Sequence, residues 1–172
     1  DRRAEDQALA HLEFQKRYDF DFIKVTPSSG YSVEDWGVNE HYLGNVEGTY
    51  EQRDHIIKHP EDWLRLPQLD PRQGALGRQL RCLELIGSGA EGVPYVQTIF
   101  NPLSVAKYLA GEDLLVTHLR RYPRIMHAAL NTITSSITEF VEQVMLTGAA
   151  GIFLAVQHAQ YGVLSEQEYR AF

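Results

Sequence analysis

The sequence predicts an α/β fold in which short parallel strands alternate with helices. Three short apolar stretches have the composition of buried strands, and longer amphipathic stretches separate them. The resulting order is helix, strand, helices, strand, helices, strand, helix. Three strands make a small sheet, so the chain forms either an open layer of three or four strands or an arc of a larger barrel.

The N-terminal part of the chain predicts a helix, a strand and a long loop. Apolar residues recur every four positions through residues 4–18, which is typical of an amphipathic helix. The β-rich stretch 21–26 is followed by Pro27, where we expect the strand to stop. Residues 28–48 hold several glycines and no sustained period, so we expect a loop with one helical turn at 33–36.

Helix-start signals mark the next part of the chain. Thr49 and Gln52 form a T-x-x-Q capping box, which predicts a helix through Ile56 and Ile57. The signals that follow predict two more helices. They are 61–66, which begins after Pro60, and 73–86, for which Gly87 is the expected C-terminal cap.

The second half begins with a strand at 94–99 and a strong helix start at Asn101-Pro102, where asparagine is the cap and proline takes the first helical position. Periodic apolar residues then predict the remaining elements. These are helices at 102–109, 112–121 and 123–147, a strand at 151–156, and a final helix opened by a capping box at Ser165.

Composition narrows the class of protein. The net charge of −7 argues against a nucleic-acid partner, and we expect the one basic cluster, Arg120, Arg121 and Arg124, to be a solvated helix face. No stretch approaches the ~20 apolar residues of a membrane span, so no membrane partner is expected. The single cysteine, Cys82, excludes an internal disulfide framework and fits a reducing compartment such as the cytoplasm. The chain lacks an initiator methionine, so we expect it to begin partway into a gene product.

Candidate site residues follow from the rule that parallel α/β proteins bind ligands at the carboxyl ends of their strands. The rule selects residues after each of the three strands: Thr26, Ser28, Phe100, Asn101, Gln157 and His158. No zinc or phosphate-binding motif is present in the sequence.

Lys24, within the first strand, is a further candidate, and it and two of the residues above have two interpretations each. Lys24 shares a strand face with Thr26, and it is either an anion-binding or pKa-tuned lysine inside a barrel or a lysine that reaches solvent. His158 is either a general acid or base or a surface histidine. For Asn101 we favour the role of helix cap over that of substrate ligand, because Pro102 follows it.

Three segments, in order and with matching spacing, resemble the uroporphyrinogen decarboxylase family over nearly the whole chain. Residues 18–25 are similar to the family's second-strand region, which leads into "F-S-D-I". Residues 93–108 are similar to "vPligFaGaPwTLmtY", and residues 147–153 to "aGadaiqlFeSha", where His158 falls on the histidine. The resemblance implies that residues 1–172 are part of a single (β/α)₈ barrel domain about twice as long as this chain.

The resemblance also implies a function, which is cofactor-free decarboxylation of a small-molecule tetrapyrrole in porphyrin biosynthesis by a homodimer. Tyr108 falls on the family's substrate-contacting tyrosine, and Gln157 replaces its substrate-contacting serine. The aspartate that holds the pyrrole N–H groups falls on Ser28, and the nearest downstream carboxylates are Glu34 and Asp35. A neutral serine does not offset the positive charge of a protonated pyrrole, so we expect a diverged substrate.

Two alternatives stay open at this point. Corrinoid-dependent methyltransferases share this barrel, and that function implies cobalamin and a zinc site built from an H-x-C motif and a distant cysteine in the C-terminal half. This sequence contains no H-x-C motif, so it neither supports nor excludes that function. A non-catalytic half-barrel interaction module is the other alternative. Its exposed sheet edges require a covering partner, such as a second copy in a homodimer.

Overall fold

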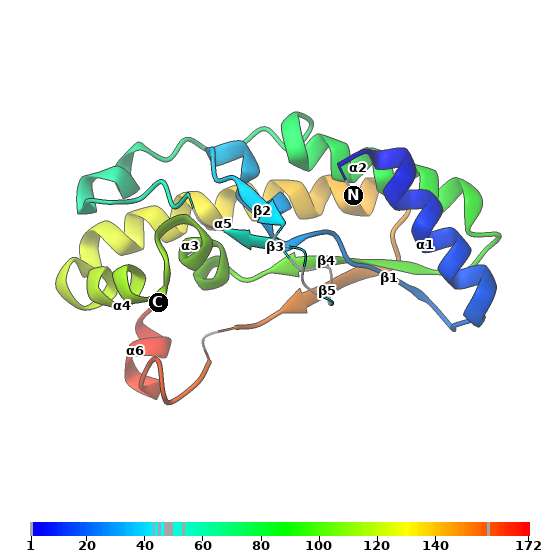
Figure 1. The fold of residues 1–172 in the computed structure, drawn as a ribbon. Coiled ribbons are helices and arrows are strands. Elements are labelled where there is room, and N and C mark those ends of the chain that lie inside the picture. Colours follow the sequence, from blue (N-terminus) through cyan, green and yellow to red (C-terminus); the bar gives the residue numbers. More distant parts are fainter. Residues whose placement is uncertain (1, 43, 45, 47–49, 53, 158) are drawn as a thin grey trace.

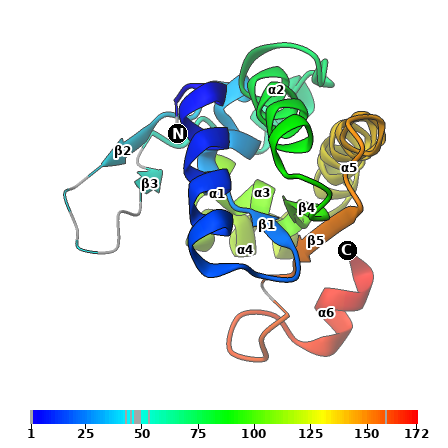
Figure 2. The same cartoon turned by 90° about the vertical axis from the view of Figure 1, so that its right-hand side faces the viewer.

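A computed structural model describes residues 2–42, 44, 46, 50–52, 54–157 and 159–172 of the chain, and its centre is a three-stranded parallel sheet (Figure 1). The strands lie in the order β1 (Ile23–Val25), β4 (Tyr95–Phe100) and β5 (Gly151–Ala155). Three helices, α1 (Ala4–Tyr18), α2 (Gly74–Gly89) and α5 (Pro123–Leu146), cover one face of it (Figures 1 and 2). The predicted α/β class with parallel strands is confirmed.

Shorter elements connect these layers. The helices are η1 (Ser29–Ser32), η2 (Glu34–Trp36), η3 (Pro60–Arg65), α3 (Pro102–Ala110), α4 (Glu112–Arg121) and α6 (Glu166–Ala171), where η denotes a 3₁₀ helix. A second sheet consists of β2 (Glu40–Tyr42) and β3 (Tyr50–Gln52), which pair antiparallel. The first of these strands lies in the region expected to be loop, and the second lies where a helix was expected to begin. In Figure 2 this pair projects away from the main sheet.

Strand alternation in β1 separates a helix-covered face from an exposed one. Ile23 and Val25 are buried, whereas Lys24 between them is exposed. Lys24 Nζ lies 4.0 Å from the ring centroid of Phe153 on β5, so these two residues share the face opposite the helices. The sheet therefore has the two unlike faces that an arc of a barrel requires.

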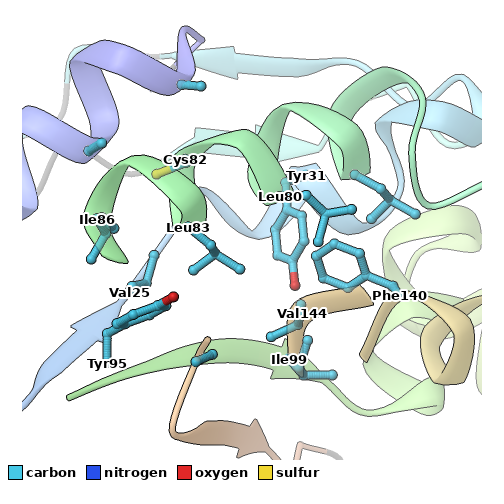
Figure 3. Close-up of a cluster of buried hydrophobic side chains, with 14 of the residues drawn as sticks. Val25, Tyr31, Leu80, Cys82, Leu83, Ile86, Tyr95, Ile99, Phe140 and Val144 are labelled. Carbon is cyan, nitrogen blue, oxygen red and sulfur yellow. The ribbon is translucent and has the colours of Figure 1, made fainter. Parts of the chain in front are cut away.

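The main core fills the space between the sheet and its three helices (Figure 3). It includes Val25, Leu83, Ile86, Ile99, Phe140 and Val144. Burying each of these side chains contributes about 1.5–3 kcal/mol. A second cluster joins α3, α4 and α5 to η3, and it buries Trp63, Leu109, Leu115, Met126 and Ile133. Together the two clusters hold the helices in fixed positions around the carboxyl ends of the strands.

The predicted helix through Ile56 and Ile57 is wrong. Thr49 lies outside the described residues, and Gln52 ends β3 instead of opening a helix. Residues 54–58 have no helical structure, and the backbone N–H of Ile57 donates to the carbonyl of Leu109 at 3.1 Å. Pairing of β3 with β2 and burial of Ile57 outweigh the local capping signal.

Gly87 is also not the C-terminal cap of α2, which continues to Gly89. A Cβ at position 87 would lie 2.8 Å from Oη of Tyr95, so a glycine there lets the helix approach the first residue of β4. The glycine therefore serves helix–strand packing rather than helix termination.

Candidate functional site

The ends of β4 and β5 are joined by the side chain of Asn101. Its Oδ1 accepts hydrogen bonds from the backbone N–H groups of Ser104 and Gln157, both at 3.3 Å, and its Nδ2 donates to the carbonyl of Gln157 at 3.4 Å. Asn101 is only 7% exposed. Its side chain caps α3, as the sequence indicated, and also fixes the backbone of Gln157.

Tyr108 and Gln157 meet beside this junction. The phenol of Tyr108 donates to Oε1 of Gln157 at 3.5 Å, and its ring lies edge-on to Phe100 with 5.8 Å between ring centroids. Both hydrogen-bonding side chains are half-buried, so each keeps a surface that a ligand can contact. Phenol and carboxamide groups both donate and accept hydrogen bonds, and this pair therefore suits a polar ligand group.

Ser28, after β1, contacts a carboxylate that the sequence-based reasoning missed. Its hydroxyl donates to Glu40 of β2, whose two carboxylate oxygens both lie 2.5 Å from Oγ. The backbone N–H of Gly30 donates to the same carboxylate at 2.7 Å. A Cβ at position 30 would lie 1.9 Å from the Glu40 carboxylate carbon, so the carboxylate keeps this position only with glycine beneath it.

The two carboxylates that follow Ser28 most closely in the sequence have other roles, as their place in the loop indicated. Glu34 pairs with Arg78 of α2, with 2.7 Å between Oε2 and Nη2. Asp35 caps the start of α2 by accepting from the N–H groups of Ala75 and Leu76 at 2.7 and 3.1 Å. The pairing of β2 with β3 brings Glu40 to Ser28, and no local sequence pattern predicts that pairing.

A buried polar network holds the loop after β1 against the sheet. Tyr31 donates from its phenol to the carbonyl of Thr98 at 2.7 Å, and burial raises the pKa of Tyr31 well above its ordinary value. Nε2 of Gln97 lies 3.5 Å from the same phenol, and Nε2 of Gln79 donates to Oε1 of Gln97 at 2.9 Å. The network connects α2, β4 and the segment that carries Ser28.

The remaining predicted site residues lie apart from these groups. Thr26 is turned toward its own strand and α1, because its N–H donates to Nε2 of His11 at 3.1 Å and its hydroxyl to the carbonyl of Lys24 at 3.4 Å. Lys24 stands over Phe153 on the exposed face of the sheet. His158 lies outside the described residues.

The structure thus brings Phe100, Asn101, Tyr108 and Gln157 together and places Ser28 with Glu40. Within the described part of the chain, no hydrogen bond or ion pair joins the first group directly to the second. In the same part there is no cluster of three or more His, Cys, Asp or Glu side chains suited to a metal ion. None of the helices described is long and apolar enough to cross a bilayer.

Comparison with known proteins agrees with this architecture. The chain resembles a methyltransferase from Methanosarcina mazei with a TM-score of 0.86 and 18% sequence identity, over 99% of this chain and 51% of that one. The chain therefore spans about half the length of that protein, whose fold of the barrel type it shares. No protein with a curated description matches the sequence. The model of the family described as uroporphyrinogen decarboxylase (URO-D) matches residues 2–172. The chain belongs to the uroporphyrinogen decarboxylase family.

Proposed function

We propose that the protein is an enzyme that binds a small molecule at the carboxyl ends of β4 and β5, and that this molecule is not uroporphyrinogen. The observation that carries the proposal is the contact between Tyr108 and Gln157, with Asn101 fixing the Gln157 backbone. Under this proposal Tyr108 and Gln157 orient a polar substrate group, and neighbouring His158 is the general acid or base. Lys24, on the exposed face of the sheet opposite the helices, binds an anionic part of the substrate.

Ser28, after β1, is the residue that disfavours uroporphyrinogen as the substrate. In the family, decarboxylation of a pyrrole acetate proceeds through a protonated pyrrole, and an aspartate next to that ring stabilises its charge. At the corresponding position Ser28 is neutral, and the nearby Glu40 already accepts hydrogen bonds from Ser28 and Gly30. Hydrogen bonds within its own loop occupy part of the acceptor capacity of Glu40. Loss of one well-placed electrostatic contact commonly costs ~3 kcal/mol of transition-state stabilisation.

Methyl transfer is the second candidate. It is supported by the fold, which the chain shares with the methyltransferase from Methanosarcina mazei. That function would use zinc and cobalamin, whereas the first proposal uses no cofactor. The two candidates therefore differ in a property that is measured without knowledge of the substrate.

The test uses the full-length protein that contains this chain. Its zinc content is measured, followed by demethylation of methylcobalamin with a thiol acceptor and conversion of uroporphyrinogen to coproporphyrinogen. The first proposal expects all three to be negative. Bound zinc together with cobalamin demethylation would establish the second candidate, and coproporphyrinogen formation would contradict both.

We also propose that the protein is a cytoplasmic homodimer. The apolar side chains of Ile152, Phe153 and Leu154 on the edge strand β5 are exposed. Their exposure favours a covering partner at this edge, either another subunit or another part of the same polypeptide. Light scattering of the full-length protein tests the dimer, and a monomer at micromolar concentration would contradict it.

A further inference from the structure

A small cavity lies between the first turns of α1 and α2 and the loop after β1. Its lining includes Gln7 of α1, Arg78 of α2, and Ser28, Glu34 and Glu40. The space open to a water-sized molecule is about 20 Å³. One water molecule needs roughly 10–15 Å³ measured in this way, so the cavity has room for a single water and for little more.

Gln7 supplies independent evidence that a ligand occupies this space. The residue is 6% exposed, and its Nε2 has no hydrogen-bond partner among the residues that the structure describes. Buried amide donors in folded proteins are nearly always paired with protein or ordered water, because an unpaired donor loses its hydration without compensation. The missing partner of Gln7 is therefore expected inside the cavity that Gln7 lines.

The charges around the cavity select the kind of ligand. Gln7 and two arginines, Arg2 and Arg78, present N–H donors, whereas Glu34 and Glu40 present carboxylate acceptors, so the lining carries as many positive as negative side chains. A metal cation does not accept a hydrogen bond from the amide and would face the guanidinium. An anion would face two carboxylates. Water satisfies both sides, because it accepts from a donor and donates to a carboxylate.

We infer that this cavity binds one ordered water molecule, which accepts a hydrogen bond from Nε2 of Gln7 and donates to the carboxylates of Glu34 and Glu40. The water links α1 to the loop after β1. It thereby adds α1 to the elements that support the Ser28–Glu40 pair, beside the loop and β2. The inference stands whether or not the proposed function is right.

A pair of substitutions in the full-length protein tests the inference by the sign of a stability change. If the water is present, Gln7→Met removes one of its partners, and the urea midpoint falls. If the cavity is dry, the same change removes an unpaired donor, and the midpoint is unchanged or rises. Thr98→Val is the matched control. Thr98 is 3% exposed, its Oγ1 also has no partner within the described residues, and it is not part of this cavity. We expect its midpoint to be unchanged or higher.

A crystal structure of the full-length protein gives a second, direct test. We expect one solvent peak within about 2.7–3.2 Å of Nε2 of Gln7 and of a carboxylate oxygen, and no such peak in the Gln7→Met crystal. An empty cavity would overturn the inference. An anomalous peak in the cavity after a bromide or rubidium soak would also overturn it, because an ion would then occupy the site.

Discussion

Ser28 donates its hydroxyl to Glu40, twelve residues further along the chain, and both carboxylate oxygens of Glu40 lie 2.5 Å from that hydroxyl. A carboxylate is thus present at the end of β1, although the residue after the strand is neutral. It accepts hydrogen bonds from its own loop, and Gly30 is the residue that makes room for it. This pair separates the chain from a family member that has an aspartate at the position of Ser28.

Gly30→Ala should displace Glu40. The added Cβ would lie 1.9 Å from the carboxylate carbon at the end of the flexible Glu40 side chain, so the carboxylate moves away and loses its hydrogen bonds to Ser28 and Gly30, at a cost of about 1–3 kcal/mol of unfolding free energy. Urea denaturation measures the loss. Gly162→Ala is the control, since a Cβ there meets nothing within 4 Å. In a Gly30→Ala, Glu40→Ala double variant the two costs should not add, because the clash is gone. Full additivity would show that Glu40 does not sit over Gly30.

Asn101→Ala should destabilise the protein more than the loss of an ordinary helix cap. The change removes the cap of α3 and both hydrogen bonds to the Gln157 backbone, and we expect a loss of about 2–3 kcal/mol in urea denaturation. Ser165→Ala, at the exposed cap of α6, is the comparison and should cost about 1 kcal/mol. Equal losses for the two variants would mean that Asn101 acts only as a cap.

Gln97→Leu should leave Nε2 of Gln79 buried without its partner. We expect a loss of about 1–3 kcal/mol, because an unpaired buried donor retains its full desolvation cost. Replacing both glutamines by leucine should recover much of the loss, since no unpaired donor then remains at position 79. A double-mutant cycle by urea denaturation gives the coupling, and a coupling near zero would argue against the network.

The contact between α4 and α6 should depend on pH through Glu168. Hydrogen bonds from Arg120 and from the N–H and hydroxyl of Ser165 lower the pKa of Glu168 to about 2. Because the folded pKa lies below the ordinary value of 4.5, the pair's stabilisation is complete above about pH 4.5 and disappears as the pH falls toward 2. NMR titration of the Glu168 carboxyl should give this low value, and Arg120→Gln should raise it. An unchanged pKa in the variant would remove the arginine as a cause.

Local sequence signals correctly predicted the helices that are marked by a capping residue or by a periodic apolar stripe. Asn101-Pro102 opens α3, Ser165 opens α6, and the apolar stripe of residues 123–147 forms α5. The same reasoning failed for Thr49 and Gln52, because the partner of β3 is β2 and a strand pairing outweighs a capping box. A local pattern reports only interactions between residues close in the sequence.

The candidate site was therefore predicted only in part. The rule for parallel sheets selected Asn101 and Gln157, which the structure joins, but it did not indicate that Asn101 fixes the Gln157 backbone. Glu40 was missed because β2 carries it to Ser28 across the intervening loop. Asp35 caps a helix forty residues away in the sequence, a role that no local pattern indicated. Each of these roles comes from a contact between distant segments.

The central claim is that this family member does not decarboxylate uroporphyrinogen, and it is tested by the rate of coproporphyrinogen formation by the full-length protein under anaerobic conditions. We expect a rate no higher than that of a no-enzyme control. Enzyme-dependent coproporphyrinogen formation would contradict the account. Its loss in Glu40→Gln would then show that Glu40 supplies the charge that Ser28 lacks.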